Sequence, residues 1–324
     1  MRVFLVTGAG VSAESGLGTF RDKGGTGIWT QFDPMKLATP EAFVRDPQEV
    51  YAFYNARRRN LITAKPNAAH FALARLETAL AERGGNLTLV TQNIDDLHER
   101  AGSKRVIHMH GELLKARCTA CEAVSPWRED VGLRDRCSAC GRTGALRPHV
   151  VWFGETPFQI SEIYAALNEA DLFVAIGTSS SVYPAAGFVS EARALGIRTC
   201  EINLEPSDNA EKFDERRYGL ASEAVPTWVD DLLTLNGFSR RTCSPPQCAS
   251  RDRVTSNGCA SRATAACSSL RPDREPTAGS RHTARQPQKL AWGAPRWEGP
   301  APGLGDDFAC ESEGGTEIER KVGG

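Results

Sequence analysis

Three groups of residues in this chain have types and spacings that could support chemistry. The first is a glycine turn, Gly8-Ala9-Gly10-Val-Ser-Ala13, directly after the apolar run Arg2–Thr7. The second is the polar stretch Thr91-Gln-Asn-Ile-Asp95, and the third is a set of four cysteines. A glycine turn between a strand and a helix can bind a pyrophosphate, because its backbone comes close to the ligand and the helix N-terminus favours negative charge. For an isolated turn of this kind, an ordinary strand–turn–helix corner is the alternative.

The glycine turn lacks one feature of a dehydrogenase site. Such a site places an acidic residue about twenty positions later, at the end of a second strand, to bind the ribose. Asp33 lies near that distance, but residues 18–34 are rich in glycine and have no periodicity, which is typical of a loop. We therefore expect the nucleotide to be held differently, and hydride transfer is not favoured.

Four of the ten cysteines form two C-x-x-C pairs with fifteen residues between the pairs. They are Cys118, Cys121, Cys137 and Cys140. This spacing is typical of a zinc ribbon, in which four thiolates hold one tetrahedral Zn²⁺. Four sulfur ligands leave no open coordination position, so one structural zinc ion per chain is predicted, and it would not activate water. Two disulfides are the alternative, which we disfavour because disulfides are rare in cytosolic proteins.

The composition limits the remaining possibilities. The chain has 324 residues, of which 40% are hydrophobic, and this is enough for a full core and a second small domain. Its formal net charge of −1 gives no overall field that would favour nucleic acid or an anionic membrane. No apolar run approaches the ~20 residues of a membrane span, and no leader precedes the first strand. We therefore expect a cytoplasmic protein.

The elements that must position these residues alternate along the chain. Hydrophobic periodicity and cap signals predict strands at 2–7, 87–91, 171–177 and 198–204, and helices at 47–64, 68–83, 184–195 and 225–235. Asp46 and Asn67 are expected to cap two of the helices. This order is typical of an α/β fold with a parallel, doubly wound sheet, whose ligands bind at the C-terminal ends of the strands. Polar clusters follow four of the strands, at Gly8–Ser12, Gln92–Asp95, Gly177–Ser179 and Asn203–Glu205.

The composition changes beyond residue 235. Residues 236–324 are rich in Ser, Pro, Arg, Thr and Gly, have little periodicity and contain scattered cysteines without metal-type pairing. We expect this low-complexity tail to be disordered. One hypothesis is that it comes from a shifted or read-through reading frame.

Residues 1–235 resemble the sirtuins, the NAD-dependent protein deacylases, and within them the bacterial desuccinylase/demalonylase-like (class III) branch. The resemblance rests on Gly8–Gly16, Thr19–Arg21, Thr91–Asp95, His110–Leu113, the four cysteines, Val150–Glu155, Gly177–Ser179 and Asn203–Glu205. It implies a catalytic domain over 1–235 with a Rossmann-like parallel sheet that binds NAD. It also implies a smaller inserted domain, with a zinc ribbon around 113–147 and a helical part around 35–80, and a substrate cleft between the two.

The resemblance also implies a reaction. In the family the carbonyl oxygen of an acyl-lysine attacks the ribose carbon that carries nicotinamide, giving an alkylimidate, and a base then deprotonates the ribose. The products would be nicotinamide and O-acyl-ADP-ribose. His110 matches the catalytic base, and the pKa of a histidine suits that role, although a strand-end histidine bonded to a backbone carbonyl is the alternative. Asn93 and Asp95 would orient the nicotinamide amide and the ribose, or cap a helix that starts at Ile94.

The rest of the NAD site is carried over from the family motifs. Gln92 would contact the ribose, Arg21 would face the phosphates, and Phe20 would shield the reaction centre from water. Several residues would line the adenosine half, with Ala221 near the adenine. The full set implied for the cofactor is Gly8, Ala9, Gly10, Ser12, Ala13, Glu14, Phe20, Arg21, Gln92, Asn93, Ile94, Asp95, Gly177, Thr178, Ser179, Asn203, Leu204, Glu205 and Ala221.

Tyr54 and Arg57 bear on the acyl group. They are three residues apart on a predicted helix and therefore share a face, although Arg57-Arg-Arg59 could also be a solvated basic run. Tyr-x-x-Arg at this place resembles the branch that removes succinyl and malonyl groups. A guanidinium can pair with a carboxylate in two hydrogen bonds, and a phenol can add a third. We expect activity on acidic acyl-lysines alongside some deacetylation.

Other functions remain as alternatives. They are a plain deacetylase, a protein ADP-ribosyltransferase on the same scaffold, and a zinc-ribbon binding module without catalysis. A nucleic-acid ribbon predicts a basic stripe with exposed aromatic residues, whereas acids such as Glu122, Glu129, Asp130 and Asp135 stand among the bases here. We expect the partners to be NAD and acylated lysine side chains of proteins, without direct nucleic-acid or membrane binding, and we favour a monomer.

Overall fold

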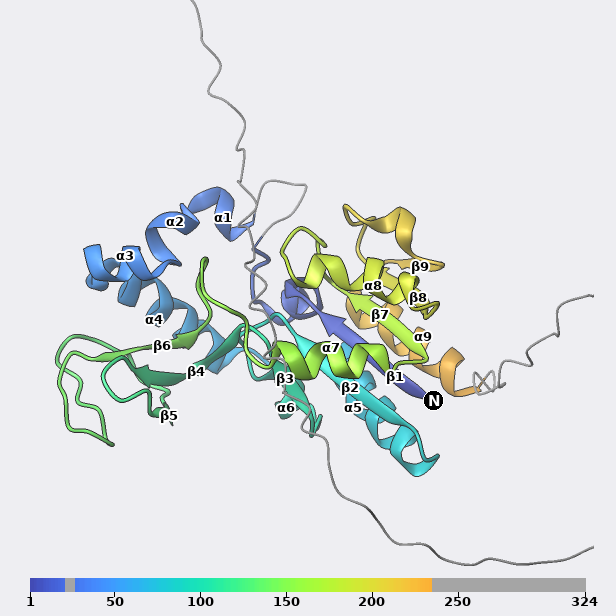
Figure 1. The fold of residues 1–324 in the computed structure, drawn as a ribbon, viewed down its shortest axis with the longest axis horizontal. Coiled ribbons are helices and arrows are strands. Elements are labelled where there is room, and N and C mark those ends of the chain that lie inside the picture. The colour runs from blue at the N-terminus through green and yellow to red at the C-terminus, as the bar shows by residue number, and fades with distance from the viewer. Residues whose placement is uncertain (21–26, 235–324) are drawn as a thin grey trace, which may run out of the picture. The chain divides into compact units, whose positions relative to one another are not determined.

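The computed structural model describes residues 1–20 and 27–234. The predicted tail and Arg21 lie outside this part of the chain. In Figure 1 the described elements form a larger module around one sheet and a smaller module that contains α1–α4 and β4–β6.

A six-stranded sheet forms the larger module. Its strands are β1 (Arg2–Thr7), β2 (Asn86–Thr91), β3 (Val106–His108), β7 (Leu172–Ile176), β8 (Arg198–Asn203) and β9 (Glu215–Tyr218). They lie in the order β3-β2-β1-β7-β8-β9, and every neighbouring pair is parallel. The direction of winding reverses between β1 and β7. The expected doubly wound topology is therefore confirmed. Parallel sheets of this kind bind ligands in the crevice outside the reversal.

Helices cover both faces of the sheet (Figure 1). They are α5 (Ala68–Glu82) and α9 (Ala221–Thr234) on one face, and α7 (Ile160–Asn168) and α8 (Phe188–Ala194) on the other. Side chains of β1 alternate between the two cores, since Val3 and Leu5 pack with α5 and α9 whereas Phe4 and Val6 pack with α7 and α8. A strand buried on both faces is apolar throughout, which explains the run that begins the sequence.

The smaller module combines short helices with an antiparallel sheet. Its elements are α1 (Ile28–Gln31), α2 (Pro34–Leu37), α3 (Pro40–Arg45), α4 (Pro47–Thr63), β4 (Gly111–Cys118), β5 (Val124–Pro126) and β6 (Leu146–Val150). Helix α4 is tied to the cysteine-bearing loops by Asn55, which donates to the carbonyl of Val131 and accepts from its N–H, each at 2.9 Å. Tyr51 adds a hydrogen bond of 2.5 Å to the carbonyl of Leu146. The range 35–80 therefore contains helices of both modules, because α5 packs on the parallel sheet.

The segments at the C-terminal ends of the strands are short. The 3₁₀ helix η1 (Ala9–Ser15) follows β1, α6 (Leu97–Arg100) follows β2, η2 (Ala185–Gly187) leads into α8, and η3 (Ala210–Lys212) precedes β9. The glycine turn thus enters a 3₁₀ helix and not the α-helix that the motif suggested. The helix after β2 begins at Leu97 and not at Ile94. The Asp95 carboxylate accepts from the backbone N–H of Leu97 at 3.1 Å, which favours a helix start at Leu97.

Both expected caps are present. Asp46 accepts from the Glu49 N–H at 3.0 Å, and Asn67 accepts from the Ala69 N–H at 2.9 Å. Helix α9 begins earlier than predicted, at Ala221, because the Glu14 carboxylate accepts from the backbone N–H of Ser222 at 2.9 Å. A carboxylate at a helix N-terminus accepts from backbone N–H groups that have no partner within the helix, and its negative charge interacts favourably with the positive end of the helix dipole.

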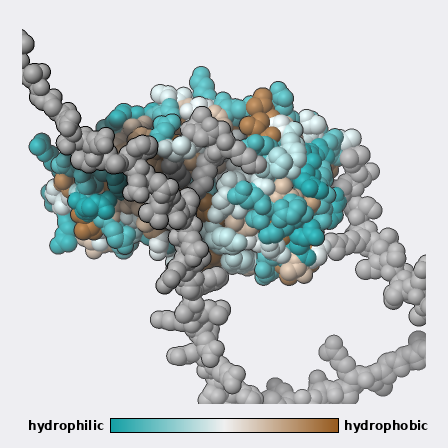
Figure 2. Space-filling view, turned by 90° about the horizontal axis from the view of Figure 1, so that it is seen from above, coloured by the Kyte–Doolittle hydropathy of each residue, from teal (hydrophilic) through white to brown (hydrophobic). Residues whose placement is uncertain are grey.

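The coloured surface in Figure 2 is mostly hydrophilic, with small hydrophobic patches. Among the described residues, the apolar side chains of Val44, Tyr183, Leu204 and Met35 are the most exposed, at 60% or more. Isolated apolar side chains are normal on a protein surface. None of the helices in residues 1–20 and 27–234 is both long and apolar enough to cross a membrane.

Candidate active site

A cavity of about 530 Å³ lies at the C-terminal ends of β1, β2, β7 and β8 and extends to α4 and β6 of the smaller module. It contains most of the residues that the sequence assigned to a nucleotide. Those that line it are Gly8, Ala9, Gly10, Ala13, Glu14, Phe20, Gln92, Asn93, Ile94, Gly177, Thr178, Ser179, Asn203, Leu204, Glu205 and Ala221, together with His110 and Tyr54. Ser12, Arg57 and Asp95 line a smaller neighbouring cavity of about 50 Å³.

Close backbone packing forms the floor of the larger cavity. The Gly10 N–H donates to the carbonyl of Gly177 at 2.8 Å, and a Cβ on Gly10 would lie 2.7 Å from the Gly177 Cα. Gly177 itself has a φ of +61°, and its own Cβ would meet the Val11 nitrogen at 2.4 Å. Only glycine fits both positions, so the turns that follow β1 and β7 pack backbone against backbone. Neither glycine places a side chain in the cavity.

His110 follows β3 and lines the larger cavity. Its Nδ1 lies 3.0 Å from the carbonyl oxygen of Gln92. A carbonyl can only accept, so Nδ1 carries the proton and Nε2 keeps its lone pair, with no hydrogen-bond partner among the described residues. Burial lowers the pKa of His110, and the Gln92 carbonyl partly opposes this. The backbone bond that was the alternative explanation for this histidine is therefore present, and it leaves the other nitrogen free as a base.

Asn93, Ser12 and Asp95 form a chain of hydrogen bonds between the two cavities. Asn93 Nδ2 donates to the carbonyl of Gly8 at 3.1 Å and to Ser12 Oγ at 3.2 Å. Ser12 Oγ in turn donates to Asp95 Oδ2 at 3.1 Å. Burial raises the pKa of Asp95, while its hydrogen bonds from Leu97 and Ser12 oppose the shift. Asp95 therefore accepts from the first backbone N–H of α6 and holds Ser12, while its role toward the ribose stays a prediction.

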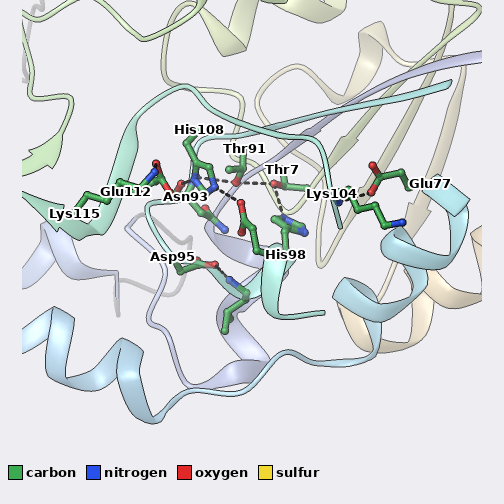
Figure 3. Close-up of polar contacts among 12 residues, drawn as sticks. Thr7, Glu77, Thr91, Asn93, Asp95, His98, Lys104, His108, Glu112 and Lys115 are labelled. Carbon is green, nitrogen blue, oxygen red and sulfur yellow. Dashed lines mark hydrogen bonds and ion pairs between the residues drawn. The ribbon is translucent and has the colours of Figure 1, made fainter. Parts of the chain in front are cut away.

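Two buried histidines lie nearby, His108 beside Asn93 and His98 beside Thr7 (Figure 3). His108 Nε2 lies 2.6 Å from Glu99 Oε1, and its Nδ1 lies 3.4 Å from the carbonyl of Asn93. Burial lowers the pKa of His108, but the hydrogen bond and charge of Glu99 outweigh it, so the net shift is upward. His98 Nε2 contacts Thr7 Oγ1 at 3.1 Å, and burial holds the pKa of His98 well below its usual value. These contacts brace the loop that carries Asn93.

Tyr54 and Arg57 share a face of α4, as expected, but they line different cavities. Tyr54 lines the larger one and accepts a hydrogen bond of 3.0 Å from Trp152 Nε1. Arg57 lines the smaller one, and its guanidinium carbon lies 4.5 Å from the centre of the Phe20 ring. Burial lowers the pKa of Arg57, and its Nε has no hydrogen-bond partner among residues 1–20 and 27–234. Ala9, Phe20, Asn93 and Ile94 line both cavities, so the two cavities adjoin there.

The four predicted cysteine ligands converge in the smaller module, with all four sulfur atoms within 4.8 Å of one another. The Sγ atoms of Cys118 and Cys140 are 3.7 Å apart, and those of Cys121 and Cys137 are 3.8 Å apart. Zn–S bonds of about 2.3 Å in a tetrahedron place the sulfurs about 3.8 Å apart. Four thiolates at this spacing fit a closed, structural zinc site.

Some lining residues were not assigned a role from the sequence. Val150, Trp152, Phe153 and Glu155 line the larger cavity, along with Val182 and Tyr183. The segment Val150–Glu155 stood out as a motif, but no local pattern indicates that an indole in it would bond to a phenol almost a hundred residues away. That relationship depends on the packing of β6 against α4.

Comparisons with known proteins agree with this geometry. Residues 8–184 match the Sir2 family. An NAD-dependent protein deacylase from Caulobacter vibrioides is 64% identical over 233 residues, which cover 72% of this chain and 97% of that protein.

Solved structures give the same result. A complex of a Sir2 homologue with NAD is 38% identical, with a TM-score of 0.63, and the match covers 71% of this chain and 89% of that one. A Sir2 complex with a deacetylated peptide and 3′-O-acetyl ADP-ribose is 30% identical, with a TM-score of 0.61, over 72% and 93% of the two chains. On sequence and on fold, this chain belongs to the Sir2 family.

Proposed function

We propose that this chain is an NAD-dependent protein-lysine deacylase that acts on acidic acyl groups, succinyl and malonyl, as well as on acetyl. The observation that carries the proposal is the composition of one cavity. It joins the bare glycine floor, the free Nε2 of His110 and the aromatic pocket of Tyr54 and Trp152. A nucleotide and an acyl-lysine could therefore meet in one cavity. The name of the 64% identical relative and the contents of the two solved complexes support this proposal.

NAD bound there would supply the ribose carbon that the acyl oxygen attacks. His110 would accept a proton from the ribose through Nε2, since Nδ1 is held by Gln92. The depressed pKa of His110 keeps this nitrogen unprotonated at neutral pH. The glycine floor would hold the pyrophosphate, and the residues after β7 and β8 would line the adenosine half, with Ala221 beside it.

Asn93 and Asp95 would hold the nicotinamide end. The Nδ2 of Asn93 is already committed to Gly8 and Ser12, so its carbonyl oxygen is left to accept from a carboxamide. Asp95 would act through its bond to Ser12 and its place in the smaller cavity. The four cysteines line neither cavity, and their closed ligand set assigns the zinc site to structure.

The acyl pocket is proposed at the boundary between the two cavities. A carboxylate placed there would meet the Tyr54 hydroxyl from one side and the Arg57 guanidinium from the other. Arg57 makes no ion pair with a described residue; its guanidinium lies over the rings of Phe20 and Phe53, and its Nε has no hydrogen-bond partner in that part of the chain. An acidic acyl group would give this guanidinium a charged partner, and acetyl would not.

Turnover of one peptide with acetyl-, malonyl- and succinyl-lysine tests the proposal. The full-length, zinc-loaded protein is mixed with NAD, nicotinamide release is measured, and the other products are identified by mass spectrometry. O-acyl-ADP-ribose with free lysine supports deacylation. ADP-ribose attached to protein would indicate a transferase instead, and no consumption of NAD would leave only a binding module. The monomeric state and the cytoplasmic location stay predictions from the sequence.

A further inference from the structure

We infer that Trp152 is a positioning residue for acyl recognition, because its indole N–H fixes the Tyr54 hydroxyl as a hydrogen-bond donor toward the acyl group. This inference rests on the proposed function and deepens it. It adds a residue that affects which acyl groups are preferred, according to whether their far end can accept a hydrogen bond. Trp152 acts through Tyr54, and its own N–H does not contact the substrate.

The two side chains form one buried pair. Trp152 is 2% exposed and Tyr54 is 5% exposed, and both line the larger cavity. Trp152 Nε1 donates to Tyr54 Oη at 3.0 Å, and the two ring centres are 6.4 Å apart. An indole N–H can only donate, so the direction of this hydrogen bond does not depend on where a hydrogen is placed.

The direction of the bond determines what Tyr54 can offer. A phenol has one proton, and its oxygen here already accepts from the indole. No described residue accepts the phenol proton, and burial raises the pKa of Tyr54 to about 12, so the proton is retained. The hydroxyl therefore presents a donor to whatever occupies the cavity. Its best partner is an acceptor such as a carboxylate or an amide carbonyl, whereas the methyl group of acetyl gains nothing.

Trp152 is held from several sides, so its N–H has a fixed direction. The guanidinium carbon of Arg147 lies 3.3 Å from the centre of the indole. Arg147 is itself fixed by two hydrogen bonds to Glu155, at 2.6 and 3.0 Å, and Glu155 accepts from the Trp152 backbone N–H at 2.8 Å. Phe43 packs against the indole as well. A clamped donor loses little conformational entropy when the substrate binds, which favours a role in positioning.

The test separates the N–H of Trp152 from its ring. Trp152→Phe keeps an aromatic ring beside Arg147 and removes the donor, and Tyr54→Phe removes the acceptor. The two variants and their double mutant are compared with wild type as zinc-loaded, full-length proteins. The substrates are one peptide with acetyl-, succinyl- or succinamoyl-lysine at saturating NAD. Succinamoyl is the matched neutral acyl group that keeps a carbonyl acceptor and loses the charge.

We expect Trp152→Phe to lower kcat/KM for the succinyl and succinamoyl peptides by roughly three- to tenfold, mainly through KM. The value for the acetyl peptide should fall by a smaller factor, because acetyl has no acceptor at its far end for the Tyr54 hydroxyl. In the Tyr54→Phe background the same Trp152 change should have no further effect on the acidic substrate, because the hydroxyl on which it acts is gone.

Equal losses for acetyl and succinyl would overturn the inference, since they would mean that Trp152 only maintains the fold. Additive losses in the double mutant would also overturn it, because Trp152 would then act independently of Tyr54. Wild-type turnover of acetyl alone would instead defeat the proposed acidic preference and the inference together. If Trp152→Phe does not fold, 3-benzothienylalanine at position 152 preserves the shape without the N–H, and the same outcomes apply.

Discussion

The Nδ1 atom of His110 and the carbonyl oxygen of Gln92 lie 3.0 Å apart, and this contact fixes the protonation pattern of the imidazole. With the proton on Nδ1, the cavity receives a lone pair. His110→Asn removes that lone pair, so turnover should fall by roughly 10²–10⁴-fold for every acyl peptide. NAD binding, measured by calorimetry, should persist because the glycine floor is unchanged. A variant with near wild-type turnover would remove His110 from the role of base.

The acid limb of the activity profile should lie below pH 6.5. Burial lowers the pKa of His110, so the neutral, basic form persists to lower pH than in a free histidine. As pH falls through this lowered pKa, Nε2 becomes protonated and kcat/KM should drop. The measurement is kcat/KM between pH 5 and 8 with one acyl peptide. If kcat/KM instead began to fall above pH 6.5, and this fall depended on His110, the pKa of His110 would be raised and not lowered.

Arg57→Met should reduce kcat/KM on succinyl peptide by roughly 10- to 100-fold, since a charge-assisted contact is worth about 1.5–3 kcal/mol. The acetyl peptide has no carboxylate and should be affected far less. Arg59→Met is the matched control, because Arg59 lies on the same helix but pairs with Asp130 at the surface, with 60% of its side chain exposed. Equal losses for both acyl groups in Arg57→Met would argue that the guanidinium supports only Phe20.

Cys121→Ser should lower the zinc content and the thermal midpoint, with loss of deacylation. Cys118 and Cys137 are buried in the same small core as Tyr51 and Val131, so releasing the metal loosens that core. Cys200→Ala is the control, because this buried cysteine lies in β8 and away from the four ligands. The zinc content per chain can be measured by mass spectrometry of the metal. The Cys200→Ala variant should bind as much zinc as wild type.

Stability should fall as the solution is acidified. Burial lowers the pKa of His70 to about 4, and that of His98 is also well below 6.5. A lowered folded pKa gives stability that is present above the unfolded value and lost as pH falls toward 4. His108 has a raised pKa, so its contribution has the opposite sign and is lost as pH rises.

For His70 the loss of unfolding free energy is about 2 kcal/mol at pH 5. Urea denaturation at pH 7.5 and 5 should therefore show a smaller difference for His70→Gln than for wild type. An unchanged difference would mean that His70 does not titrate in this range.

Local signals in the sequence predicted much of the fold. The apolar run of β1, the caps Asp46 and Asn67 and the cysteine pairs each depend on residues within a short window. Other features depend on distant partners. The start of α9 is set by Glu14, more than two hundred residues earlier in the chain. The 3₁₀ helix η1 begins against Gly177, which accepts from the Gly10 N–H and lies far from it in the sequence.

The site shows the same division. Most of the assigned nucleotide residues line one cavity, because strand ends in a parallel sheet meet at one edge. The helical spacing of Tyr54 and Arg57 correctly gave a shared face, but it could not give the cavity that each side chain lines. That depends on Phe20, which stacks on the guanidinium, and on Trp152, which bonds to the phenol.

Asn55 holds the loop residue Val131 by two hydrogen bonds and is the immediate neighbour of Tyr54 on α4. Arg58, which is fully buried, donates to the Asn55 side chain and to the carbonyl of Leu113. The metal-supported loops and the acyl pocket thus share one stretch of helix. Loosening the cysteine-bearing loops would therefore also disturb the stretch of α4 that carries Tyr54.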